Sequence, residues 1–349
     1  MFAKPSACQQ LGIKHALSDA SAGYIAGCWL LFLPIEILAT LFIVYNLIAF
    51  GCQPIFSLLP ERFEKNAIRF SLLLTTVALM IPAENYWLTL LCMASASALF
   101  HVSAGARSLR TAHQNTLQIS WFVAPGVLGL LTGIAAGISE FTGAFWILMI
   151  GLFLSILISD TGHLTKPPTS QNFELHSFRF WLATTLLLLI SIRSLVWSFY
   201  QGYLPLEPPI LLTLGVAAFL GKLAGGWLDT HYTLNQWLLP VLMTATYLLL
   251  LTEQTGSLVT LAFGLACLQS VTPVMLKALN QYLQKPALSA SLGLGLAITL
   301  GGGILSILTA AHNTSADSIF IIPAALLMTC LLVIPLLTVK IMSSPGTTK

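Results

Sequence analysis

Residues 180–203 read FWLATTLLLLISIRSLVWSFYQGY, an apolar run interrupted by a single charge, Arg193. A helix of about 20 apolar residues spans the roughly 30 Å hydrocarbon core of a bilayer. Such a continuous run also excludes the alternating strands of a membrane β-barrel. The stretch therefore predicts a transmembrane helix that carries a cation inside the bilayer.

The composition of the chain as a whole agrees with this reading. Hydrophobic residues make up 56% of the 349 residues, charged residues 8%, and the mean hydropathy is +0.87. A soluble protein carries about 25% charged residues, so most of this surface must face lipid. The net charge of +3 is small and scattered, and we expect no nucleic-acid partner.

Twelve apolar runs follow one another along the chain, and they predict an all-α polytopic membrane protein with twelve transmembrane helices. The predicted spans are 15–33, 36–58, 69–83, 86–106, 117–138, 142–159, 180–203, 208–228, 236–252, 257–276, 287–311 and 318–340. Residues 1–14 are polar and lack the pattern of a cleavable signal peptide.

Basic residues are distributed unevenly between the loops that separate these runs. Thirteen of the 15 Lys and Arg residues lie in alternate segments that include both termini. The six remaining loops hold none, and each contains one acid: Glu36, Glu84, Glu140, Glu207, Glu253 and Asp317. Because basic loops resist translocation, we expect both termini in the cytoplasm of a bacterium, with the chain crossing its inner membrane many times.

The polar segment 161–178 contains two adjacent prolines and divides the chain into two halves, 1–160 and 179–349, of six helices each. The glycine runs that begin at Gly126 and Gly293 lie 167 residues apart, and the loop acids Glu84 and Glu253 lie 169 residues apart. The pattern predicts two six-helix pseudo-repeats, a plan that transporters use with a substrate site between the halves.

Five motifs resemble the major facilitator superfamily of transporters. SLLPERFEKN (57–66) and GGWLDTHY (225–232) are similar to the loop motif that the family carries once in each half. HALSD (15–19), RSLVW (193–197) and KPALSASLGLGLA (285–297) resemble the fosmidomycin-resistance-like branch of drug exporters. The resemblance implies the major facilitator fold and transport of a small molecule.

The same resemblance implies that Glu61, Arg62 and Asp229 belong to a conformational latch between the two halves. The first loop departs from the family pattern, because Ser57 and Glu64 stand where the family has glycine. These departures support the fold more strongly than they support drug export.

Two charged residues inside the predicted spans are candidates for the substrate and proton pathway, because buried charges in a membrane are costly. Arg193 could receive an anionic group of the substrate, or it could form a structural ion pair. Asp19 shares a helix face with His15 and could carry a proton. Alternatively, Ser18 and Asp19 could cap the start of the helix.

Polar residues of the predicted fourth and tenth helices complete this set. His101 could change its charge near neutral pH, or it could simply hydrogen-bond a neighbouring helix. Gln269 could contact the substrate, or it could hold two helices together. In the resembled family, the helices of Asp19, His101, Arg193 and Gln269 line the central cavity. Further candidates are Tyr45, Asn46, Trp121, Tyr200 and Gln201. We expect Lys222 to extend to the cytoplasmic surface.

The leading hypothesis is a secondary active transporter that moves a small organic solute by alternating access, coupled to protons, with export slightly favoured. An uptake carrier for a small anionic metabolite is the first alternative. The second is a membrane sensor or scaffold that does not transport. We find no enzyme signature, no ATP-binding loop and no paired cysteines, and so expect no cofactor or metal. We expect a monomer in the lipid bilayer.

Overall fold

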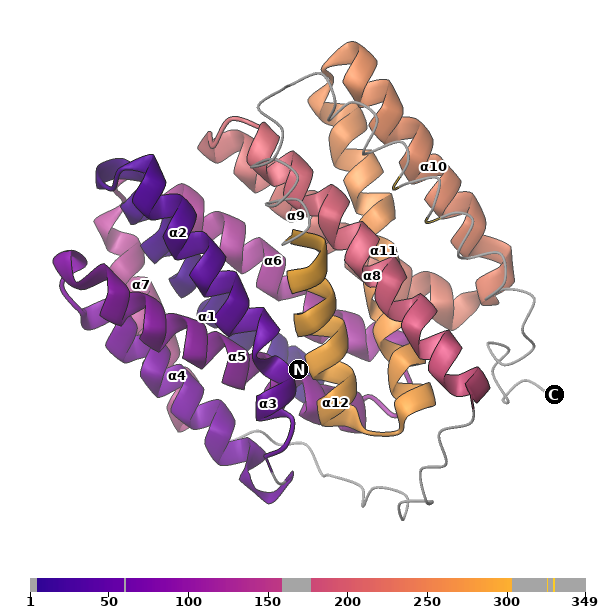
Figure 1. Ribbon diagram of the computed structural model, residues 1–349, viewed down its shortest axis with the longest axis horizontal. Helices are drawn as coiled ribbons and strands as arrows, with labels where there is room; N and C mark the ends of the chain where they lie inside the picture. Colours follow the sequence, from indigo (N-terminus) through magenta and orange to yellow (C-terminus); the bar gives the residue numbers. More distant parts are fainter. Residues whose placement is uncertain (1–4, 60, 159–176, 303–324, 326–328, 330–349) are drawn as a thin grey trace, which may run out of the picture.

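The computed structural model describes residues 5–59, 61–158, 177–302, 325 and 329. It is helical throughout this part of the chain (Figure 1). The helices are α1 (Ala7–Phe32), α2 (Ile35–Asn46), α3 (Gln53–Phe56), α4 (Glu64–Met80), α5 (Tyr86–Thr111), α6 (Thr116–Ile138), α7 (Thr142–Leu157), α8 (Ser177–Tyr203), α9 (Pro208–His231), α10 (Leu234–Thr255), α11 (Leu258–Leu283) and α12 (Pro286–Ser291).

Helix α1 begins earlier than the first apolar run predicts. Ser6 is its N-cap and forms a capping box with Gln9, which satisfies two free backbone N–H groups. Ser18 and Asp19 therefore lie in the middle of the helix, and the hypothesis that they cap its start is wrong. The Asp19 carboxylate does not serve a helix end, and it needs another explanation.

The second predicted span is one helical stretch, Ile35–Phe56, but it is not α-helical throughout. A π-helical turn (Leu47–Gly51) follows α2, and the short helix α3 begins after it with Pro54 in its first turn. Proline lacks a backbone N–H and cannot continue the α-helical ladder of the preceding turn. A second π-helical turn (Leu292–Leu296) follows α12, and the two turns pack against each other.

The helices before and after the undescribed segment form two groups that lie side by side (Figure 1). Within the first group, α1 and α6 pack closely through glycine. A Cβ atom at Gly129 or Gly133 would lie 2.9 Å from the Cα atom of Ala16 or Ala20, respectively. Such small residues allow membrane helices to approach backbone to backbone.

The two groups meet along α6 and α9. Gly226 of α9 lies against Leu117 and Ser120 of α6, and Gly215 lies against Leu128 and Leu131. The contact therefore extends along much of both helices. It brings the centre of α9 next to the centre of α6, where the polar residues described below are found.

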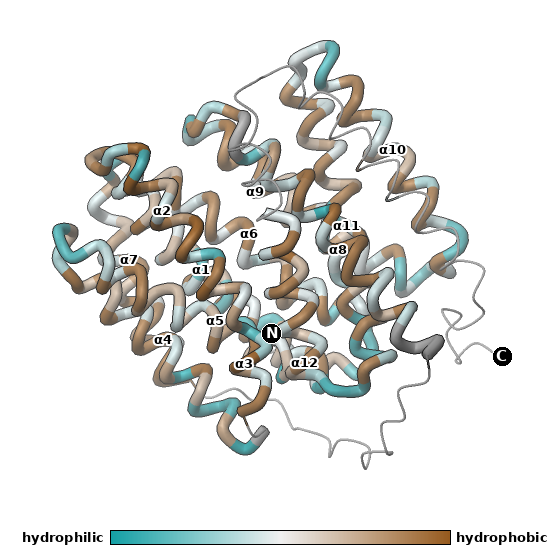
Figure 2. Tube along the Cα trace, viewed as in Figure 1, coloured by the Kyte–Doolittle hydropathy of each residue, from teal (hydrophilic) through white to brown (hydrophobic). Residues whose placement is uncertain are grey.

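Seven helices of the described part of the chain are long and apolar enough to cross a membrane. Hydrophilic residues gather near the helix ends, and the middles are hydrophobic (Figure 2). Large apolar side chains also face outward, among them Trp146 and Trp181, which are 65% and 68% exposed. The chain is a multi-pass membrane protein. Nearly all of the predicted last span, 318–340, and of the linker 161–178 lies outside the described residues.

Consecutive long helices run in opposite directions, so the loops fall at two ends of the bundle. We call one end the acidic end, because its loops and adjoining turns contain Glu36, Glu84, Glu140, Glu207 and Glu253. The other is the basic end, where the chain turns near Arg62, Lys65, Arg110 and Lys285.

Candidate substrate and proton pathway

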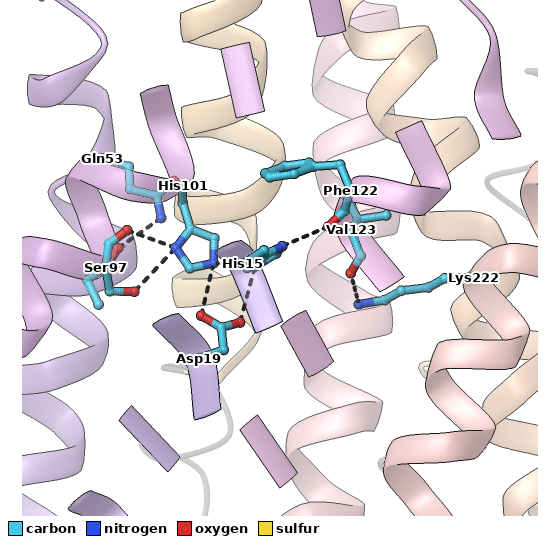
Figure 3. A network of polar contacts seen from close by, with 9 residues as sticks. His15, Asp19, Gln53, Ser97, His101, Phe122, Val123 and Lys222 are labelled. Carbon is cyan, nitrogen blue, oxygen red and sulfur yellow. Dashed lines mark hydrogen bonds and ion pairs between the residues drawn. The ribbon is translucent and has the colours of Figure 1, made fainter. Parts of the chain in front are cut away.

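Three of the predicted site residues meet in one buried cluster, and we call it the histidine cluster: His15 and Asp19 of α1 and His101 of α5 (Figure 3). The Nε2 atoms of the two histidines are 3.0 Å apart. The Asp19 carboxylate lies 3.1 Å from His15 Nε2 and 3.8 Å from His101 Nε2. The donor and acceptor atoms of the cluster lie within 4.8 Å of one another, a spacing that a metal ion could also use.

Backbone carbonyls fix the orientation of both imidazole rings. His15 Nδ1 donates to the Phe122 carbonyl at 2.8 Å, and His101 Nδ1 donates to the Ser97 carbonyl at 2.8 Å. A carbonyl oxygen can only accept, so both Nδ1 atoms carry a proton. In two neutral rings the lone pairs of both Nε2 atoms would then face each other. One added proton between them forms an N–H···N hydrogen bond, with Asp19 as its counter-ion.

Helix α6 supplies the carbonyl that His15 uses, and Pro125 explains the local geometry. A proline inside a helix leaves the carbonyl four residues earlier, here that of Trp121, without its helix hydrogen bond, and its ring disturbs the turn that contains Phe122 and Val123. The Phe122 carbonyl accepts from His15. The adjacent Val123 carbonyl accepts from Lys222 Nζ of α9 at 3.2 Å (Figure 3).

This contact corrects the interpretation of Lys222. We expected its side chain to reach the cytoplasmic surface, but it is 91% buried, with a relative exposure of 9%. The small residues of α9 let it approach α6 closely, and the disturbed turn of α6 offers an acceptor nearer than water. Lys222 thus brings a positive charge from the second group of helices to the side of the histidine cluster.

Arg193 and Gln269 form a second polar contact in the middle of the bundle. Arg193 Nη1 of α8 donates to Gln269 Oε1 of α11 at 2.8 Å, and Nη2 donates to Ser194 Oγ at 2.8 Å. Thr272 also donates to Gln269 Oε1, at 3.3 Å. Arg193 and Gln269 were predicted separately, and the structure places them in direct contact.

The remaining candidates lie in four kinds of surroundings. Tyr45 lies beside Ser97 and the histidine cluster. Gln201 lines a cavity described below. Tyr200 instead donates to Glu253 of α10 at 2.9 Å, and Asn46 donates to the Phe42 carbonyl of its own helix at 2.9 Å. Trp121 is partly exposed on α6, where its backbone carbonyl lies against Gly12 of α1.

At the basic end, the predicted latch residue Asp229 joins the two groups of helices. Its carboxylate accepts from Lys277 Nζ of α11 and from Thr116 Oγ1 at the start of α6. Thr116 lies in the first turn of its helix, where the helix dipole favours a negative charge. Arg62 is exposed, with its guanidinium over the neighbouring Phe63 ring, and of Glu61 only the backbone is described.

Two further contacts at this end were not predicted. Glu64, which stands at a family glycine position, forms a buried ion pair with Arg110 of α5. Gln281 donates to Gln114 at 3.2 Å, and these residues lie 167 residues apart. Arg110 and Lys277 also lie 167 residues apart, and each pairs with an acid. The shared offset could have revealed these pairs in the sequence.

A cavity of about 320 Å³ lies nearer the acidic end, between the two groups of helices. Residues of α1, α2 and α6 form one side, and residues of α8, α9 and the loop between them form the other. The lining includes Ala26, Leu30, Phe42, Leu131, Gln201 and Leu214. The two groups of helices are therefore hydrogen-bonded to each other at the basic end, and a cavity lies between them towards the acidic end.

No protein-family description and no curated protein matches this sequence. Solved structures do match the fold. A crystal structure of the major facilitator superfamily transporter FucP in the outward conformation aligns with a TM-score of 0.69 and 14% identity, over 95% of this chain and 96% of that chain. The chain has the major facilitator fold. A structure of a variant of the E. coli fucose:proton symporter FucP gives 0.65 and 15%, over 95% and 96%.

The major facilitator fold confirms the resemblance at the level of architecture. At this identity the match concerns the fold alone, and the likeness to the fosmidomycin-resistance-like branch stays a prediction. The histidine cluster and the Arg193–Gln269 contact lie on α1, α5, α8 and α11, the first, fourth, seventh and tenth of the predicted spans.

Proposed function

We propose that this protein is a secondary active transporter that moves a small organic solute by alternating access, coupled to protons. One observation carries the proposal. Ionisable side chains of four helices, α1, α5, α8 and α9, gather between the two groups of helices in the middle of an apolar bundle. Buried charges are costly in a membrane and commonly mark substrate or proton pathways.

The histidine cluster is the proposed proton site. His15 and His101 offer two opposed Nε2 atoms, and Asp19 offers a carboxylate beside them. Imidazole gains and loses protons in the physiological range of pH. A proton taken up by the cluster from one side of the membrane and released to the other would link solute movement to the proton gradient.

Alternating access requires two halves that open at either end in turn. We propose two six-helix repeats, 1–160 and 179–349, making twelve spans in all. The contact between Gln114 and Gln281, 167 residues apart, supports this symmetry. If the basic end faces the cytoplasm, as the distribution of Lys and Arg favours, then the cavity opens outward and Asp229 holds the inner side closed.

The direction of transport is proposed from resemblance alone, and export from a bacterial cell through the inner membrane by a monomer is slightly favoured. Uptake of a small anionic metabolite is a second candidate, which the buried Arg193 favours. A sensor or scaffold without transport is the alternative of another class. It would bind a ligand without moving it.

The test begins with a ligand screen. A ligand that binds only the folded protein raises its melting temperature, so purified protein can be screened against organic solutes by thermal stabilisation. Radiolabelled solutes that stabilise the protein are then assayed in proteoliposomes under an imposed pH gradient. Accumulation that a protonophore abolishes supports the proposal. Saturable binding with no movement into the vesicles would favour the sensor.

A further inference from the structure

Arg193 and Lys222 are two buried cations that have no carboxylate partner among the residues the structure describes. Their relative exposures are 8% and 9%, and within the described part of the chain neither forms an ion pair. Arg193 contacts the neutral oxygens of Gln269 and Ser194, and Lys222 contacts the carbonyl of Val123. Buried charges in proteins are normally paired, because an isolated charge in a low-dielectric interior is very costly.

The guanidinium of Arg193 has an open edge. Its Nε atom is buried and has no acceptor among the described residues. The neighbouring Nη2 atom donates to Ser194 Oγ, and that hydroxyl in turn donates to the Ile190 carbonyl at 2.8 Å. Nε and Nη2 form the side of arginine that binds both oxygens of a carboxylate or phosphate. Ser194 therefore accepts from one of the two N–H groups on this edge, and an oxyanion would accept from both.

The charges around this edge leave one positive charge without a partner. Arg193 and Lys222 are close enough to interact electrostatically, and Asp19 also acts on Lys222. Asp19 is already engaged by His15 and His101. Two cations thus share one carboxylate that is committed elsewhere. With both histidines neutral, one additional negative charge would balance Arg193, Lys222 and Asp19.

The cavity near the acidic end lies along the same two helices, α8 and α9, that carry these cations. Gln201 and Leu214 line it, and each lies eight residues along its helix from Arg193 or Lys222, respectively. At 1.5 Å per residue, both cations lie about 12 Å beyond the cavity lining. Helices α8 and α9 run in opposite directions, so the two side chains reach the same depth.

We propose that Arg193 and Lys222 form a subsite for an oxyanion, and that the solute is an organic anion bearing a carboxylate or a phosphate-type group. The oxyanion binds the Nε–Nη2 edge of Arg193 and is neutralised by Lys222. This inference rests on the proposed function only in calling the anion a transported solute. Binding of the anion itself is measured on the purified protein, without transport.

The experiment measures the melting temperature of the purified full-length protein against increasing acetate and, separately, inorganic phosphate. Ionic strength is held constant with chloride, and acetamide is the uncharged control. We expect a saturable rise with at least one anion and none with acetamide. The anion that saturates at the lower concentration identifies carboxylate or phosphate chemistry.

Variants separate this subsite from general salt effects. Arg193→Gln and Lys222→Met should each abolish the saturable rise, whereas Lys65→Gln, at an exposed lysine, should keep it. If either neutral variant does not fold, Arg193→Lys is used. Lysine keeps the charge but cannot donate two parallel N–H groups to the oxyanion. This variant should raise the half-saturating concentration at least tenfold, which corresponds to about 1.4 kcal/mol of binding free energy.

Equal stabilisation of Arg193→Gln and the unchanged protein, or no saturable rise with either anion, would overturn the subsite. A saturable rise in a protein that moves no solute in proteoliposomes would leave the subsite intact and refute the transport proposal instead. Transport of an uncharged solute, with no rise in melting temperature in either anion, would support the transport proposal and refute the subsite.

Discussion

His15 and His101 face each other through their Nε2 atoms, 3.0 Å apart, although 86 residues separate them in the sequence. Both rings are held from behind by backbone carbonyls, so neither can turn its Nδ1–H towards the other without losing a buried hydrogen bond. The pair can be satisfied by one proton, and the Asp19 carboxylate beside it balances the charge.

The first prediction tests this proton site with His101→Asn. Asparagine can still donate to the Ser97 carbonyl, but it is too short to meet His15 Nε2. Solute accumulation driven by a pH gradient should fall to the level of empty vesicles, while exchange of solute across the membrane without a gradient is retained. The control is His231→Asn, on an exposed histidine bonded to the Trp227 carbonyl. Unchanged gradient-driven accumulation in His101→Asn would remove the pair from the coupling step.

A second prediction concerns Gly126 of α6. A Cβ atom there would lie 2.5 Å from His15 Cε1 and 2.7 Å from Asp19 Oδ2, closer than real Cβ atoms approach other atoms. Gly126→Ala should therefore displace the histidine cluster, cost about 1–3 kcal/mol of stability through overpacking, and abolish gradient-driven transport.

The matched control for Gly126 is Gly215→Ala in α9. A Cβ atom at Gly215 would meet its nearest neighbours at 3.4 Å, an ordinary contact. Alanine is also a better helix former than glycine, by up to about 1 kcal/mol. This variant should keep its activity and its melting temperature. Equal activity in both variants would show that the cluster tolerates displacement.

The third prediction addresses the ion pair between Glu64 and Arg110. Both side chains have a relative exposure of 6%. Arg110→Ala would leave a buried carboxylate without this cation, which typically costs about 3–5 kcal/mol. Thermal or chemical denaturation in detergent should show a marked loss of stability. Arg62→Ala removes an exposed arginine and should change stability by no more than about 0.5 kcal/mol. Similar values for the two variants would mean that the pair stabilises nothing.

The helical architecture could be predicted from the sequence because lipid imposes a simple rule: long apolar runs must be helices. Arg193 and Asp19 were identified for the same reason, since a charge stands out in an apolar run. The π-helical turn Leu47–Gly51 before Pro54 was missed, because the apolar run continues through it. The early start of α1 was also missed, because its first turns are polar and are buried by neighbouring helices.

The pairing of the site residues could not be predicted, because it depends on how helices pack. Lys222 looked like a surface lysine in the sequence. Only the glycine contacts between α9 and α6, and the disturbed turn before Pro125, bury it. Tyr200 was a candidate for the substrate and proton pathway, yet it donates to Glu253 of α10. No periodicity of a single helix contains this information.

A fourth prediction tests the orientation of the chain. The acidic end should face outward, because basic loops stay in the cytoplasm. In a version without the six natural cysteines, Glu84→Cys and Glu253→Cys should react with a membrane-impermeant maleimide in intact cells. Lys65→Cys, at the basic end, should react only after permeabilisation. The opposite pattern would invert the orientation and, with it, the side to which the cavity opens.

The last prediction concerns Asp229, whose carboxylate joins Lys277 of α11 to Thr116 of α6 at the basic end. Asparagine keeps the shape but loses the charge, and a hydrogen bond to a charged group contributes about 1.5–3 kcal/mol. Asp229→Asn should therefore raise the population open at this end about tenfold or more, since 1.4 kcal/mol corresponds to a factor of ten.

The reporter is Ser120→Cys in the cysteine-free chain: Ser120 is fully buried against Gly226 and becomes accessible only when α6 and α9 separate. Its rate of labelling by a small maleimide should rise by the same factor, whereas Thr230→Val, one residue further along α9 with its hydroxyl bonded within its own helix, should leave the rate unchanged. An unchanged rate in Asp229→Asn would mean that the closed basic end is held by the glycine packing of α6 and α9 and not by this carboxylate.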